Sequence, residues 1–125
     1  MNEAVVSIAK ILLAEDDDDM RRFLVKALQN AGYNVASFDN GLSAYNRLRE
    51  EPFELLLTDI VMPGLRGPDL ARQVLKVHPD IHILYMSGYA EGFPDSQMAS
   101  NAVFLQKPFR FATLLAQLKL VRRRP

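Results

Sequence analysis

A regular alternation between short apolar runs and longer segments of helical periodicity constrains the fold of this chain more than any other feature. Five apolar runs are too short for helices and predict buried strands. They are residues 10–14, 35–38, 53–57 and 81–86 and the neighbours of Val103. Strands that alternate with helices pair in parallel through right-handed crossovers, so helices should cover both faces of the sheet. The sequence therefore predicts a three-layer, doubly wound α/β domain.

Apolar residues at helical spacing predict helices between the strands and after the last one. They run from Met20 to Ala31, Leu42 to Leu48, Leu70 to Leu75, and Phe111 to Val121. Asp17 to Asp19 can cap the first helix, and Gly32 can close it. Pro68 suits the first turn of the third helix. The stretch from Ser87 to Asn101 is less regular, and only a short or frayed fourth helix is expected there.

Composition narrows the class of protein. The 125 residues hold 15 basic and 15 acidic side chains, so a basic surface for nucleic acid is not expected. Cysteine is absent, which excludes disulfides and thiolate chemistry. No apolar run approaches the roughly 20 residues of a membrane span, and no basic leader opens the chain. We therefore expect one cytoplasmic domain over 1–125, with a core over about 9–121, no membrane contact and no output domain.

Polar side chains end the predicted strands. Glu15 and Asp16 follow the first strand, Asp59 the third, Ser87 the fourth and Lys107 the fifth. The carboxyl ends of parallel strands share one edge, where ligands bind, so these groups should converge. Carboxylates at close quarters repel one another, and a hard cation such as Mg²⁺ relieves that repulsion. The set predicts a carboxylate nucleophile, a cation, a hydroxyl and an ammonium around one phosphoryl position.

Four blocks of the sequence carry a resemblance to a known family. ILLAEDDDDMRR, LLLTDIVMPG, LYMSGYA and LQKPF, in this order, resemble the signature blocks of response-regulator receiver domains. The resemblance spans nearly the whole chain. It implies a flavodoxin-like sheet of order 2-1-3-4-5 and a role as a phosphoprotein in two-component or phosphorelay signal transduction.

The resemblance also implies metal-site roles. Asp59 would be the phospho-acceptor and a ligand of Mg²⁺ or Mn²⁺. Asp16 would bind the cation directly, Glu15 through water, and Val61 through its backbone carbonyl. Glu15 stands where relatives more often have aspartate, which lengthens one arm of the site.

Further roles follow from the same resemblance. Ser87 would hydrogen-bond the phosphoryl group and Lys107 would pair with it. Ser87 and Phe104 would form the conformational switch, Phe104 standing at the aromatic switch position without the tyrosine hydroxyl. Tyr89 and Pro108 would flank the site, and the Lys107–Pro108 bond resembles the family's cis peptide.

The resemblance leaves the pathway open. The first half is similar to stand-alone receivers of the CpdR type, which a kinase phosphorelay phosphorylates and which control substrate delivery to an ATP-dependent protease. The second half is similar to terminal receivers of hybrid histidine kinases. The expected partners are a histidine kinase or a His phosphotransfer protein, and a downstream protein, for which a protease-adaptor pathway is one candidate.

Two other classes compete with the receiver interpretation, under which the chain catalyses only its own phosphorylation and dephosphorylation. A phosphatase of the haloacid-dehalogenase type also uses an aspartate nucleophile and Mg²⁺. Such enzymes typically carry a second acid two residues after the nucleophile, where this chain has Val61. A flavodoxin-like electron carrier needs a Ser/Thr-rich phosphate loop after the first strand, and the acids at 15–19 would repel phosphate.

Overall fold

The computed structural model describes residues 9–62, 65–88 and 102–122, which contain a parallel sheet of five strands in the order β2-β1-β3-β4-β5. The strands are β1 (Lys10–Ala14), β2 (Asn34–Phe38), β3 (Leu55–Asp59), β4 (His82–Ser87) and β5 (Val103–Gln106). The predicted strand order is confirmed.

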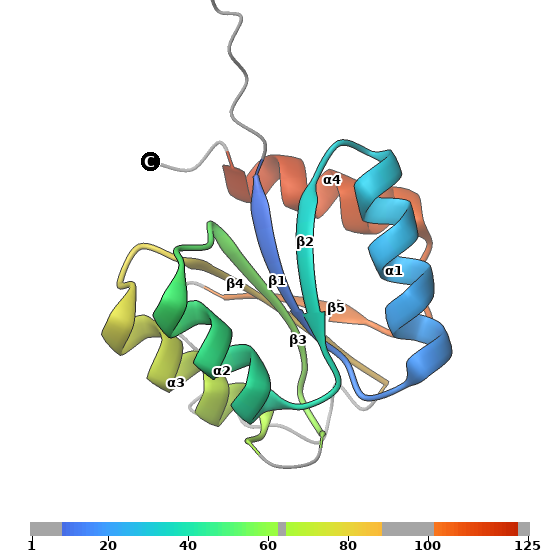
Figure 1. Cartoon of the computed structure of the whole chain (residues 1–125). Helices are drawn as coiled ribbons and strands as arrows, with labels where there is room; N and C mark the ends of the chain where they lie inside the picture. Colours follow the sequence, from blue (N-terminus) through green and yellow to red (C-terminus); the bar gives the residue numbers. More distant parts are fainter. Residues whose placement is uncertain (1–8, 63–64, 89–101, 123–125) are drawn as a thin grey trace, which may run out of the picture.

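Helices cover both faces of the sheet, as predicted for a doubly wound fold (Figure 1). The described helices are α1 (Asp18–Asn30), α2 (Gly41–Glu50), α3 (Gly67–Val77) and α4 (Phe111–Arg122). In Figure 1, α1 and α4 lie on one side of the sheet and α2 and α3 on the other. The helix expected between β4 and β5 falls mostly on residues 89–101, outside the described residues. None of the described helices is long and apolar enough to span a bilayer.

Two apolar cores follow from the alternation of side chains along each strand. In β1, Leu12 and Ala14 belong to the core beneath α2 and α3, whereas Ile11 and Leu13 belong to the core beneath α1 and α4. Since both faces of β1 are buried, the strand has the unbroken apolar run expected of a central parallel strand.

Local signals set the ends of α1. The Asp17 side chain accepts a hydrogen bond from the Met20 amide at 2.8 Å and thereby caps the helix. Gly32 has a φ of 98° just beyond its end, a conformation that glycine adopts without steric cost. Both predicted helix signals are confirmed, and the cap fixes where the β1–α1 loop becomes helical.

The third strand begins two residues later than predicted, at Leu55 rather than at Phe53. Phe53 is buried and apolar, but the Lys10 ammonium lies 5.1 Å from its ring centroid, and the pairing with β1 starts at Leu55.

Leu42, which helped to mark the second helix, is 58% exposed. The buried positions of α2 are Gly41, Ala44 and Leu48, a spacing of three and four that turns Leu42 toward solvent.

Candidate functional site

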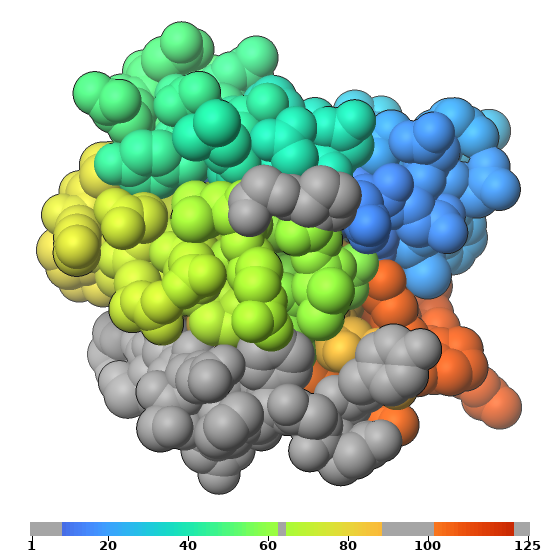
Figure 2. All heavy atoms as spheres, turned by 90° about the horizontal axis from the view of Figure 1, so that it is seen from below, coloured from blue at the N-terminus to red at the C-terminus, as the bar shows by residue number. Residues whose placement is uncertain are grey.

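The carboxyl ends of the strands bring the predicted polar residues to one edge of the sheet. Glu15 and Asp16 follow β1, Asp59 ends β3, Ser87 ends β4, and Lys107 follows β5. Figure 2 looks onto this edge, where the blue atoms after β1, the green atoms after β3 and the orange atoms after β5 meet.

Three carboxylates form a compact cluster at this edge. One carboxylate oxygen each of Glu15, Asp16 and Asp59 lies within 4.8 Å of the other two. Glu15 is 0% exposed and Asp59 7% exposed, whereas Asp16 is exposed. A cluster of carboxylates with one exposed member suits Mg²⁺, which takes one or two carboxylates and keeps several waters. The residues present therefore fit a hard divalent cation.

Lys107 bridges two of these acids. Its ammonium lies 2.6 Å from Glu15 Oε1 and 3.2 Å from Asp59 Oδ2. The Lys107 amide donates to the Ser87 carbonyl at 2.8 Å, which anchors the start of the β5–α4 loop to β4. The Lys107–Pro108 peptide bond is cis, as the resemblance implied. The sequence predicted that Lys107 would lie at the same edge and pair with a phosphoryl group, but not that Glu15 would be its closer partner.

Glu15 is held from several directions at once. Its Oε2 accepts the Asp17 amide at 3.0 Å, and its own amide donates to the Phe38 carbonyl of β2 at 3.0 Å. Burial opposes ionisation of this carboxyl, but hydrogen bonds with Asp59 and Lys107 outweigh it and lower its pKa below the ordinary value of 4.5. Glu15 is therefore the ionised partner of Lys107.

Asp59 shows the opposite shift. Burial, and then the hydrogen bond and charge of Glu15, raise its pKa from 3.8 to about 8, and the attraction of Lys107 only partly offsets this. Without a cation, Asp59 is therefore harder to ionise than an ordinary carboxyl group. A carboxylate nucleophile must be ionised, so a cation that displaces its proton would also activate the residue.

The two predicted switch residues lie on β4 and β5. Ser87 is buried at the end of β4, on the same face as Ile83 and Tyr85. Phe104 is partly buried in β5 and packs against the core of that face.

Two of the predicted site residues lie in loops, and a third is not among the described residues. The side chain of Val61 is exposed in the loop after β3, and Pro108 is exposed after Lys107. Tyr89 lies outside the described residues, so its predicted place beside the site is untested.

Two residues that the sequence predictions did not assign to the site support it. Arg21 donates from Nη1 to the Glu15 carbonyl at 2.9 Å. The Gly67 amide donates to the Ile60 carbonyl at 3.0 Å, and a Cβ on Gly67 would overlap the carbonyl oxygen of Asp59. An arginine six residues after the acid that follows a strand is an ordinary feature of a charged helix, and a glycine before Pro68 suggests only a turn. Neither signal pointed to the site.

A 2-1-3-4-5 parallel sheet with an aspartate ending β3 and a lysine following β5 defines a receiver-type α/β protein. The family model for the response regulator receiver domain matches residues 11–119. This chain belongs to that family, whose members act in two-component signalling.

Two characterised proteins are similar to most of this chain. The response regulator receiver protein CpdR of Brucella abortus is 54% identical over 112 residues, which cover 88% of this chain and 93% of that protein. Sensor kinase CckA of the same organism is 37% identical over 115 residues, covering 89% of this chain but only 12% of the kinase.

Among solved structures, the response regulator TrrA of Thermotoga maritima, in complex with Mg²⁺–BeF, aligns with a TM-score of 0.79 at 25% identity. The alignment covers 91% of this chain and 99% of TrrA.

Proposed function

We propose that this protein accepts a phosphoryl group on Asp59 with the help of a divalent cation. One observation carries the proposal. The buried Asp59 carboxylate lies 3.2 Å from the Lys107 ammonium. One of its oxygens also lies within 4.8 Å of a carboxylate oxygen of Glu15 and of Asp16. A nucleophile, a fixed positive charge and a place for a cation are thus together at one edge of the sheet.

The reaction forms one bond and breaks another. An Asp59 carboxylate oxygen attacks the phosphorus of a phosphohistidine, the P–N bond breaks, and the imidazole leaves with the electron pair and takes up a proton. Lys107 would then pair with a phosphoryl oxygen, and the Ser87 hydroxyl would donate to another.

Asp16 and Asp59 would bind Mg²⁺ or Mn²⁺ directly, Glu15 through water, and Val61 through its carbonyl. A cation bound there supplies charge that neutralises the transferring oxygens. The complex of TrrA with Mg²⁺–BeF supports this assignment for a related fold.

A direct test uses acetyl phosphate and Mg²⁺. The wild-type chain should gain one hydroxylamine-sensitive phosphoryl group, and Asp59→Asn should gain none, because an amide is not a useful nucleophile. Asp19→Asn is the matched control, since Asp19 carries a carboxylate whose side chain is 92% exposed outside the cluster. Labelling of Asp59→Asn at the wild-type rate would place the acceptor elsewhere.

The signal would leave through a protein-binding surface. Ser87 and Phe104 lie on the same face of the sheet, and Phe104 pairs in register with Tyr85, two residues before Ser87. Movement of Ser87 toward a phosphoryl group would open space that the Phe104 ring can fill. Because phenylalanine has no hydroxyl to satisfy, its inward rotamer buries no polar group.

The partners follow from the relatives. An identity of 54% over almost the whole of CpdR supports a CpdR-like role, with a histidine kinase or a His phosphotransfer protein as the phosphodonor and a protease-adaptor pathway downstream. A receiver domain within a hybrid kinase is the alternative, favoured by the similarity to CckA. Purified kinases and phosphotransfer proteins, compared for the rate of transfer to Asp59, would separate the two roles.

The phosphatase alternative predicts a different result. An enzyme of haloacid-dehalogenase type would release phosphate repeatedly from phosphomonoesters. Membership of the receiver family and the valine at position 61 both weigh against it. Steady turnover of p-nitrophenyl phosphate that depends on Asp59 would contradict the proposed function.

A further inference from the structure

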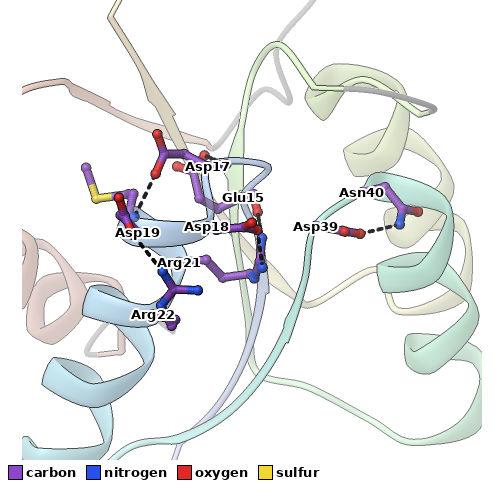
Figure 3. Close-up of polar contacts among 9 residues, drawn as sticks. Glu15, Asp17, Asp18, Asp19, Arg21, Arg22, Asp39 and Asn40 are labelled. Atoms are coloured by element: carbon purple, nitrogen blue, oxygen red, sulfur yellow. Dashed lines mark hydrogen bonds and ion pairs between the residues drawn. The ribbon is translucent and has the colours of Figure 1, made fainter.

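Arg21 connects the first turns of α1 to the loop that carries two acids of the site. Its Nη1 donates to the Glu15 backbone carbonyl at 2.9 Å, and its Nη2 donates to Asp18 Oδ1 at 2.6 Å (Figure 3). Its side chain is only 18% exposed. We propose that Arg21 is a positioning residue for the cation site, because it fixes the Glu15–Asp16 peptide and so directs the Asp16 carboxylate toward the cluster.

The proposal rests on the proposed cation-dependent phosphorylation and adds a residue that does not touch the cation. The Glu15 carbonyl and the Asp16 amide belong to one planar peptide unit, so holding the carbonyl oxygen also sets the direction in which Asp16 leaves the backbone. Asp16 is exposed, and packing therefore does little to orient it. Groups that orient metal ligands from the second layer commonly govern affinity for the ion.

The rest of the loop explains why one contact to the carbonyl matters. The Glu15 amide is already tied to Phe38 and its carboxylate to the Asp17 amide and Lys107. Arg21 holds the carbonyl on the peptide that leads into Asp16. The backbone is thus fixed on both sides of Glu15.

An arginine suits this task better than a lysine. Its planar guanidinium presents two donors in a fixed geometry, one for the carbonyl and one for the Asp18 carboxylate. Asp18 belongs to the first turn of α1, so the fork also ties the loop to the helix. A lysine ammonium has the same charge but lacks the planar fork.

Arg22 provides a matched control within the same helix. It pairs with Asp19 at 2.6 Å with the same spacing of three residues, so both arginines make the same kind of ion pair. The Arg22 side chain is 70% exposed, and the contact to Asp19 is its described hydrogen bond. The Arg21 contact to the Glu15 carbonyl is therefore the difference to be tested.

The experiment measures the dissociation constant of Mg²⁺ by titration calorimetry at fixed ionic strength. Arg21→Lys keeps the charge and removes the fork, so the constant should rise by about 10-fold, the lower end of the range for groups that orient metal ligands. Arg22→Lys should stay within about twofold of the wild type, because it alters no contact to the site. Circular dichroism establishes that each variant is folded.

Methionine variants separate positioning from simple electrostatics, because the two predict opposite signs. Loss of a positive charge near a cation site should tighten Mg²⁺ binding, as expected for Arg22→Met. Arg21→Met should instead weaken it. Equal constants for the two lysine variants, or tighter binding by Arg21→Met, would overturn the role of Arg21. Absence of Mg²⁺ binding by the wild type would overturn the proposed cation site itself.

Discussion

The pKa values of Asp59 and Glu15 shift in opposite directions because the surroundings of the two carboxyl groups differ. Glu15 holds the closer contact to Lys107 and also accepts the Asp17 amide, so its charged form is stabilised. Asp59 is also buried but faces the negative charge of Glu15 and a more distant ammonium. The free-energy cost of a second buried negative charge therefore falls on Asp59, the residue proposed to react.

These opposite shifts predict how the stability of the cation-free protein changes with pH. The pKa of Asp59 is about 8 in the folded chain against an ordinary 3.8, so the folded state binds more protons between these values. The free energy of unfolding should consequently fall as pH rises from about 4 toward 8. The lowered pKa of Glu15 acts in the opposite sense but only below about pH 4.5, where its stabilisation is lost as pH falls through the folded value.

Urea unfolding in EDTA at pH 5.5 and pH 8 would measure this slope. Asp59→Asn should be more stable than the wild type at pH 8 and should flatten the slope, because the amide cannot ionise. Asp19→Asn should keep the wild-type slope. Mg²⁺ should restore stability to the wild type at pH 8 by mass action. An Asp59→Asn slope as steep as that of the wild type would assign the pH dependence to another group.

The sequence predicted the members of the cluster but not their pairing. Glu15, Asp59 and Lys107 could be named because each stands next to the carboxyl end of an apolar run. Their distances depend on strand register and on the reach of each side chain, which no local pattern encodes. The Arg21 contact to a backbone carbonyl could not be predicted from the sequence either, since it depends on the path of the β1–α1 loop.

At the scale of elements, the start of α3 is set by its close approach to the end of β3. The Gly67 amide donates to the Ile60 carbonyl, and the Gly67 Cα faces the Asp59 carbonyl without room for a Cβ. Glycine is the residue that permits two backbones to approach so closely. The position of the proposed nucleophile is therefore tied to the first residue of a helix.

Gly67→Ala should destabilise the protein by about 1–3 kcal/mol, the usual cost of overpacking a rigid site. The gain in helix propensity, about 1 kcal/mol at most, is smaller and does not reverse the sign. Gly88→Ala is the control, because a Cβ there would meet no atom of the described residues within 4 Å, although Gly88 also follows a strand at the same edge. Chemical unfolding measures both, and equal stabilities would show that α3 shifts without cost.

The limits of a helix or strand were predicted correctly where neighbouring residues in the sequence determine them. β1 has the predicted limits, and the cap at Asp17 and the glycine at 32 mark the ends of α1 because a single side chain or backbone angle determines each. The predicted start of β3 was wrong because Phe53 is buried by packing and does not pair with a neighbouring strand. Burial and pairing coincide in most of the sheet, and they separate where a strand begins.

At the scale of the whole molecule, the sheet separates two cores that share the same strands. In β5, Phe104 packs toward the core beneath α2 and α3, whereas Leu105 packs toward the core beneath α1 and α4. Phe104 on one face of β5 is therefore next to Leu105, which shares the core on the other face with residues of α4. Ser87 lies on the Phe104 face, one strand nearer to Asp59. We propose that the sheet is the physical link between the proposed site and α4.

Beryllofluoride with Mg²⁺, which mimics a phosphoryl group on Asp59, should therefore shift the NMR signals of Ser87, Phe104 and α4 together. Ser87 should move because a new buried acceptor left without a donor is costly, and the Phe104 ring should follow into the space vacated. Phe104→Ala should still accept a phosphoryl group, because it leaves the acid cluster and Lys107 unchanged, but the shifts in α4 should become smaller. If only residues of the acid cluster moved in the wild type, with Phe104 and α4 unchanged, the link through the sheet would be wrong and the signal would have to leave through α1 instead.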